Sequence, residues 1–172
     1  GSLIEGTRDG STLVVKELEI LKTVTQRLDA AGIPYMVTGS MAINYYAVPR
    51  MTRDIDIVVE LSTRDTDRLC DIFQEDFYID REAVRRSIEK KGMFNIVHRA
   101  FVIKADFVVR KDTDYRREEF ARRRRVTVEG RDLYMVAPED LILSKLDWAR
   151  DTSPEVEQKL REMLLQRSGE ER

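Results

Sequence analysis

Two segments in which apolar residues alternate with polar ones constrain the fold of this chain most strongly. Residues 54–61 read Asp-Ile-Asp-Ile-Val-Val-Glu-Leu, and residues 101–109 carry Phe, Ile, Ala, Phe and Val at every second position. Successive side chains of a β-strand point to opposite faces of the sheet, so this spacing predicts two strands, each with one buried face. The opposite faces carry Asp54, Asp56 and Asp106. If the two strands lie side by side, three carboxylates meet there.

The remaining pattern surrounds these strands with helices. The length of 172 residues fits one domain. We expect residues 1–10, which begin with Gly-Ser and show no periodicity, to be tag-like and disordered, and residues 11–172 to form a single α+β domain with a helical C-terminal part over 138–166. The expected helices are 13–31, 40–47, 62–75, 81–90, 115–124, 138–150 and 153–166. The expected strands are 35–37, 54–61, 94–98, 101–109, 125–128 and 133–136.

Single cysteine and histidine residues exclude several kinds of chemistry. Cys70 cannot form an internal disulfide, and with His98 alone the chain cannot assemble a zinc site or a histidine-centred nucleophile motif. The chain has 32 Asp and Glu residues, so an enzyme of this composition would use oxygen ligands and a hard cation such as Mg²⁺. No apolar run exceeds five residues, which argues against a membrane span and favours a cytoplasmic location.

The paired aspartates on one strand call for an explanation. Asp54 and Asp56 repel each other, and aspartate is disfavoured in strands. A cation between them would remove that cost, and three carboxylates suit one or two Mg²⁺ ions that clamp a phosphoryl displacement. The alternative is ordinary solvated charge at a strand end, with Lys104 paired to Asp106.

A possible anion site precedes this strand. Val37-Thr38-Gly39-Ser40 reads as a strand, a tight turn and a helix start, and thirteen residues separate Ser40 from Asp54. Glycine permits close backbone approach, and the N–H groups at a helix start favour an anion. The alternative for Gly39-Ser40 is a common helix cap. Together with the aspartates, the turn indicates a nucleotide site.

These residues resemble the nucleotidyltransferase superfamily, whose palm is of the DNA polymerase β type. The shared pattern is a strand, Gly39-Ser40, a short interval and Asp54-Ile55-Asp56-Ile57, with a third carboxylate, here Asp106, on a later strand. Segments 50–53 and 138–146 resemble small bacterial members, including antitoxin-type ones. Thr38 stands where a hydrophobic residue is usual. The resemblance spans about residues 13–150 and implies the mixed sheet of that superfamily with helices around it.

The resemblance also implies a reaction. Two Mg²⁺ ions would bridge a nucleoside triphosphate, ATP above all, and a nucleoside monophosphate would pass to an acceptor hydroxyl with release of pyrophosphate. The implied catalytic and metal-binding residues are Asp54, Asp56 and Asp106, and the implied nucleotide-binding residues are Gly39, Ser40, Arg53 and Lys145. Lys145 has an alternative as an ordinary polar residue of an amphipathic helix.

A basic run suggests a further partner. Residues 110–131 hold nine Lys and Arg against five acids, and Arg122–Arg125 are consecutive. An RNA acceptor would use such charge, whereas the structural alternative is a solvated helix end that suits the helix dipole. The aromatic residues Tyr45, Tyr46 and Trp148 could stack on a base, although such spacings are more typical of a core.

Three hypotheses therefore remain open from the residues. The first is an active Mg²⁺-dependent nucleotidyltransferase whose acceptor is a small molecule, a protein hydroxyl or an RNA end. The second is a catalytically silent nucleotide-binding or antitoxin-like regulatory protein with the same fold. The third is a basic interaction domain whose aspartates are surface charge. A homodimer or a partner protein is compatible with each, and a membrane is not expected.

Overall fold

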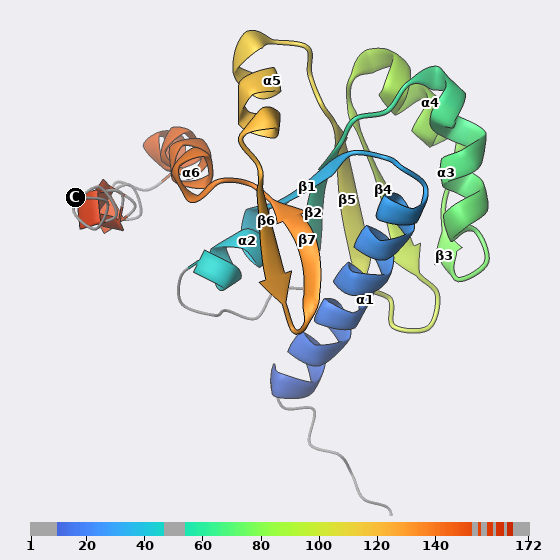
Figure 1. Ribbon diagram of the computed structural model, residues 1–172, viewed down its shortest axis with the longest axis horizontal. Helices are drawn as coiled ribbons and strands as arrows, with labels where there is room; N and C mark the ends of the chain where they lie inside the picture. The colour runs from blue at the N-terminus through green and yellow to red at the C-terminus, as the bar shows by residue number, and fades with distance from the viewer. Residues whose placement is uncertain are drawn as a thin grey trace, which may run out of the picture.

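The computed structural model describes residues 10–46 and 54–152, together with residues 155, 158, 159, 161–163, 165 and 166. A seven-stranded mixed sheet forms its centre, in the order β3-β4-β5-β2-β1-β7-β6 (Figure 1). The strands are β1 (Tyr35–Thr38), β2 (Asp54–Val59), β3 (Phe77–Tyr78), β4 (Met93–His98), β5 (Lys104–Val109), β6 (Arg124–Val128) and β7 (Arg131–Met135).

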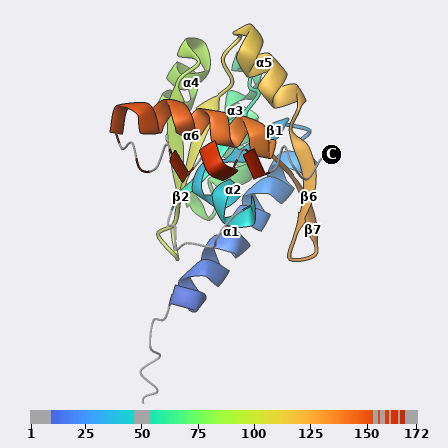
Figure 2. The same cartoon turned by 90° about the vertical axis from the view of Figure 1, so that its left-hand side faces the viewer.

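Helices lie on both faces of this sheet. Figure 1 shows α3 (Thr66–Phe73) and α4 (Arg81–Lys90) on one side, with α2 (Gly39–Tyr46) and α6 (Pro138–Thr152) on the other. The remaining helices are α1 (Gly10–Ala30) and α5 (Asp114–Ala121), and a 3₁₀ turn, η1 (Thr63–Asp65), precedes α3. Figure 2 shows α6 running across the molecule in front of α2. The mixed sheet with its flanking helices is the α+β architecture expected from the sequence.

The alternating segments determine which side of the two central strands is buried. Strand β2 runs parallel to β5 and antiparallel to β1. Ile55, Ile57 and Phe107 are fully buried. The Phe107 ring lies 6.1 Å from that of Phe73 on α3. The apolar face of both strands therefore packs against α3, and the aspartate face lies on the side of α2.

Most expected elements are present within a few residues, and five details differ. The strand expected from Phe101 begins at Lys104, because His98 donates its backbone N–H to Ile103 and Val102 donates back to His98, which closes a tight reversal. The helix expected over 62–75 is a 3₁₀ turn followed by a shorter α-helix, and β3 was not expected. Helix α5 ends at Ala121, so Arg124 already belongs to β6.

The fifth difference concerns the end of α4. Glycine commonly ends a helix, so the sequence predicts a stop at Gly92, but the residue that adopts the left-handed conformation is Lys91, with φ of 52°. The backbone N–H of Gly92 donates to Ser87 at 2.8 Å and completes the helix end. The segment Glu129–Asp132, between the expected strands 125–128 and 133–136, predicts a hairpin turn, and the structure has this turn, with positive φ at Glu129 and Gly130. The helix expected over 153–166 lies only partly within the described residues.

Among the described helices, none combines the length and the apolar character required to cross a lipid bilayer.

Candidate active site

The pairing of β2 with β5 brings the aspartates together. In this parallel pair Asp56 lies opposite Asp106 and Asp54 lies opposite Lys104. Neighbouring strands are about 4.8 Å apart, and residues that pair across them share a face. The condition set by the sequence pattern, that the two strands lie side by side, is therefore met, and the three carboxylates occupy one face at one end of both strands.

Asp56 lies in an environment that disfavours its ionised form. Its pKa is raised above the ordinary value, first by burial, then by the negative charge of Asp106, and then by that of Asp54. The positive charges of Lys145 and Lys104 act in the opposite direction. Because burial and like charge both disfavour the ionised form, this group gains from a cation.

Asp106 contributes an oxygen that no described residue satisfies by a hydrogen bond. Its Oδ1 atom is buried and has no hydrogen-bond partner among the described residues. The ammonium group of Lys104 lies 3.6 Å from that oxygen, which is a charge contact beyond hydrogen-bond length. Buried polar atoms in proteins are nearly always partnered, so an orphaned carboxylate oxygen indicates a ligand position.

Gly39 joins β1 to α2 directly against the aspartates. Its φ of +65° lies in the left-handed region, which glycine adopts without steric cost. A β-carbon built on it would lie 2.2 Å from Asp56 Oδ2 and 2.9 Å from the Asp56 β-carbon. No side chain fits there, so the first turn of α2, with half-buried Ser40, stands immediately beside the carboxylate.

The structure describes one of the two basic residues expected at this site, Lys145. Lys145 is half-buried on α6, a helix that packs against α2. Its charge acts on Asp56, as described above, so it lies on the carboxylate side of the sheet. Arg53 lies outside the described residues, and its expected role stays a prediction.

The donor set fits a hard divalent cation. It consists of carboxylate oxygens, which Mg²⁺ prefers. One oxygen of Asp106 has no hydrogen-bond partner among the described residues, and the Asp56 carboxylate is repelled by the negative charges of Asp106 and Asp54. Within the described parts of the chain, no three Asp, Glu, His or Cys side chains are already arranged as a metal cage. Holding an ion would therefore require side-chain rotation, which exposed Asp54 permits.

The sequence patterns do not indicate one polar neighbour of the three aspartates. Asn95 on β4 lies opposite Asp106 in the antiparallel β4–β5 pair and is exposed. It thus occupies the side of Asp106 that faces away from Asp56. An isolated asparagine in a short strand gives no periodic or motif signal, so only the strand register identifies it.

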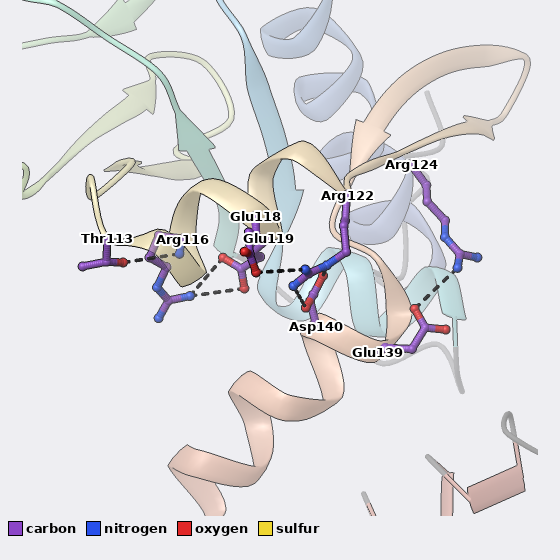
Figure 3. Close-up of polar contacts among 8 residues, drawn as sticks. All are labelled: Thr113, Arg116, Glu118, Glu119, Arg122, Arg124, Glu139 and Asp140. Atoms are coloured by element: carbon purple, nitrogen blue, oxygen red, sulfur yellow. Dashed lines mark hydrogen bonds and ion pairs between the residues drawn. The ribbon is translucent and has the colours of Figure 1, made fainter.

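The four arginines at 122–125 make contacts within the protein, and Figure 3 shows those of Arg122 and Arg124. Arg122 donates two hydrogen bonds to buried Asp140 at the start of α6, at 2.8 and 3.0 Å. Arg124 pairs with Glu139 at 3.5 Å, and Arg125 pairs with Asp132 at 3.4 Å. The remaining residue, Arg123, stacks its guanidinium over the rings of Phe120 and Tyr134. These contacts favour the structural interpretation of the run over an RNA surface.

Most of the other residues considered for the site have structural roles. The ring of His98 stacks on Phe101 at 4.9 Å and meets Phe77 edge-on, and its Nδ1 accepts the backbone N–H of Phe101. Tyr46 donates its hydroxyl to the carbonyl of Val136. Tyr45 is 44% exposed and packs edge-on against Tyr46. The side chain of Trp148 lies outside what the structure describes.

Comparison with known proteins gives a family and a fold. The family described as aminoglycoside-2''-adenylyltransferase matches residues 20–140. Among solved structures, the Thermotoga maritima protein TM1012, titled a nucleotidyltransferase, is 18% identical with a TM-score of 0.54, and the match covers 88% of this chain and 94% of that one.

Two structures of ANT(2'')-Ia are also similar. The solution structure, titled an antibiotic-resistance factor, is 15% identical with a TM-score of 0.57, over 88% of this chain and 85% of that one. The crystal structure with adenylyl-2''-tobramycin is 16% identical with a TM-score of 0.51, over 87% and 90%. At these identities the structures establish the fold alone. No curated protein matches the chain significantly by sequence.

Proposed function

The chain belongs to the aminoglycoside-2''-adenylyltransferase family and is a nucleotidyltransferase, and from that premise we propose that it transfers AMP from Mg²⁺-bound ATP to a hydroxyl group of a small-molecule acceptor. The observation that carries the proposal is the register of β2 and β5, which places Asp56 opposite Asp106 with Asp54 on the same face. A surface-charge interpretation of the aspartates gives no reason for this convergence.

The reaction joins the acceptor oxygen to the α-phosphorus of ATP and breaks the bond between that phosphorus and the bridging oxygen of pyrophosphate. The hydroxyl proton leaves to a base, and pyrophosphate departs with the bond electrons. Asp106 is the proposed base, because its buried Oδ1 has no hydrogen-bond partner within the described structure and so keeps a lone pair available.

The other residues of the site have binding roles in this proposal. Asp54 and Asp56 would hold Mg²⁺ together with Asp106. The backbone at Gly39 and the hydroxyl of Ser40 would hold the terminal phosphates, because Gly39 has no side chain and the turn opens a helix. Lys145, whose charge already reaches Asp56, would neutralise charge on the departing pyrophosphate, and Arg53 is a further phosphate candidate.

Magnesium, when bound, would supply neutralisation of the triphosphate charge and would favour loss of the acceptor proton. The protein contributes mainly position and fixed charge, which explains why a chain with one histidine and one cysteine can support this chemistry.

The family name suggests the first acceptor to test. Aminoglycosides carry ring hydroxyls, and the ANT(2'')-Ia crystal structure holds adenylyl-2''-tobramycin. Tobramycin is therefore the first probe, without implying that it is the natural acceptor.

The test is to incubate the protein with ATP labelled at the α-phosphate, Mg²⁺ and tobramycin, and separately with the small-molecule fraction of a cell extract. We expect label in an acceptor and one pyrophosphate released for each label transferred. Asp56→Asn should abolish both, whereas Asp112→Asn, on a loop aspartate that is 60% exposed, should retain them. Binding of Mg²⁺-ATP without pyrophosphate release under any of these conditions would favour the catalytically silent alternative.

A further inference from the structure

The stereochemistry of the proposed reaction determines the side from which the acceptor approaches the three aspartates. In an in-line displacement the attacking and leaving oxygens lie on opposite sides of the phosphorus. The proposed pyrophosphate-binding groups, Gly39, Ser40 and Lys145, come from the β1–α2 junction and from α6, on the β1 side of Asp56. The acceptor must then approach from the β5 side, over β4 and β3.

The strand register defines what lies on that side. Pairing places Asn95, Asp106, Asp56 and Thr38 in one row across β4, β5, β2 and β1. The adjacent row towards the start of β5 contains Tyr78, Val97, Lys104 and Asp54, and the row on the other side contains Met93, Val108, Val58 and Met36. Residues paired across strands share a face, so all three rows lie on the aspartate side of the sheet.

The outer part of these rows is open to solvent. Tyr78 is 62% exposed and Met93 is 59% exposed, and Asn95 between them is exposed as well. Val97 is half-buried. We call Tyr78, Met93, Asn95 and Val97 the β4 shelf. Large apolar side chains are usually covered, so exposed ones that adjoin a catalytic group indicate a substrate surface.

The chemistry of the β4 shelf narrows the class of acceptor. Asn95 offers both a donor and an acceptor next to Asp106, which suits a hydroxyl adjacent to the one that reacts. The apolar and aromatic neighbours suit the C–H face of a ring. No carboxylate belongs to the β4 shelf, so positive charge on the ring is not required for contact with it.

We propose that Asn95 is a positioning residue for the acceptor, which lies on the β4 shelf with its reacting hydroxyl over Asp106. This inference rests on the proposed function. It adds the side from which the acceptor approaches and a specificity residue that the triad does not include.

The experiment compares Asn95→Trp and Asn95→Ala with the unaltered protein. The donor is α-labelled ATP with Mg²⁺, and the ring probes are tobramycin, which is cationic, and myo-inositol, which is uncharged. Tryptophan suits a strand and would cover the shelf, so Asn95→Trp should reduce labelling at least about tenfold. Asn95→Ala should raise the KM for the ring about tenfold, the equivalent of one good hydrogen bond, and leave the KM for ATP within about twofold.

The matched control is Thr127→Trp, which places the same side chain at an exposed position of β6, at the far edge of the sheet. It should label acceptors as the unaltered protein does. Thermal stabilisation by Mg²⁺-ATP should be the same in all variants, which shows that the fold and the nucleotide site are intact.

Three results would overturn the inference. Normal transfer by Asn95→Trp would remove the shelf from the acceptor path. An unchanged KM for the labelled acceptor in Asn95→Ala would show that Asn95 does not position the acceptor. Loss of Mg²⁺-ATP stabilisation in Asn95→Trp alone would assign Asn95 to the nucleotide instead. If the unaltered protein releases no pyrophosphate with any acceptor, the proposed function itself fails, which is a distinguishable outcome.

Discussion

Gly39 and Asp56 are in such close contact that a β-carbon on Gly39 would lie 2.2 Å from Asp56 Oδ2. The glycine begins α2 and the aspartate is in β2, so this contact links the proposed phosphate-binding turn to the proposed metal ligand. Two features require glycine at position 39: its positive φ, and the lack of space for a β-carbon beside Asp56. The second feature involves a proposed metal ligand directly.

Substitution Gly39→Ala should therefore abolish transfer, because the methyl group would displace the Asp56 carboxylate. The left-handed backbone should add a stability loss of about 1–2 kcal/mol. The measurements are label transfer and thermal unfolding. Gly130→Ala is the matched control, since Gly130 has φ of +80° and nothing within 4 Å of an added β-carbon. It should lose similar stability and keep activity; if it loses activity to the same extent, the contact with Asp56 is not the cause.

Removal of the charge on Asp56 should stabilise the metal-free protein at neutral pH. The folded-state pKa of Asp56 lies above its ordinary value, first because of burial, so the ionised group destabilises the fold. The native state binds this proton more tightly than the unfolded state, so the destabilisation is present at pH 7 and disappears as the pH falls through the raised pKa towards about 4.

Thermal unfolding in EDTA between pH 4 and pH 7 measures this effect. The Asp56→Asn variant should have a higher melting temperature than the unaltered protein at pH 7, and this difference in melting temperature should shrink on acidification. A lower melting temperature for Asp56→Asn at pH 7 is the contrary result. Added Mg²⁺ should raise the melting temperature of the unaltered protein only.

Lys145 should act on the transferred phosphates rather than on the fold. Lys145→Met keeps much of the length of the side chain but removes its charge, so we expect transfer to slow about a hundredfold, as for loss of one electrostatic contact to a transition state. Lys111→Met, at an exposed position of the loop after β5, is the control. Equal transfer rates for the two variants would show that Lys145 is an ordinary residue of the helix surface.

The pair formed by Arg122 and Asp140 should stabilise the attachment of α6. Asp140 is only 3% exposed, and Arg122 donates two hydrogen bonds to it (Figure 3). Arg122→Ala leaves a buried carboxylate without this partner and should lower the melting temperature more than Asp140→Asn does. The double variant should recover part of the loss. Strictly additive effects in this cycle would show that the two residues are not coupled.

The sequence alone predicts the parts of this protein that depend on local periodicity. Alternation over 54–61 and 101–109 predicts the central strands, which the structure has over 54–59 and 104–109, because each has one face against the core. Local periodicity does not determine which strands pair, so the sequence alone does not predict that Asp56 lies opposite Asp106. The left-handed conformation of Val102, with φ of 54°, could not be anticipated, because valine disfavours it.

The residues proposed for the site also divide into those that a local sequence pattern indicates and those that it does not. Gly39, Ser40 and the three aspartates follow a spaced motif, and the sequence therefore indicates them. Asn95 matters only through its register with Asp106, two strands away from Asp56, which no single segment reveals. The arginine run leaves both of its interpretations open at the level of sequence, because its acidic partners Asp132, Glu139 and Asp140 lie in later segments.

The central claim is that Asp56 and Asp106 together hold the cation that carries the triphosphate. Calorimetric titration of ATP, with and without Mg²⁺, into the unaltered protein, Asp56→Asn, Asp106→Asn and the control Asp112→Asn tests it most directly. The account predicts Mg²⁺-dependent binding to the unaltered protein and the control, and its loss in the other two variants. Equal Mg²⁺-dependent affinity in all four proteins would contradict it.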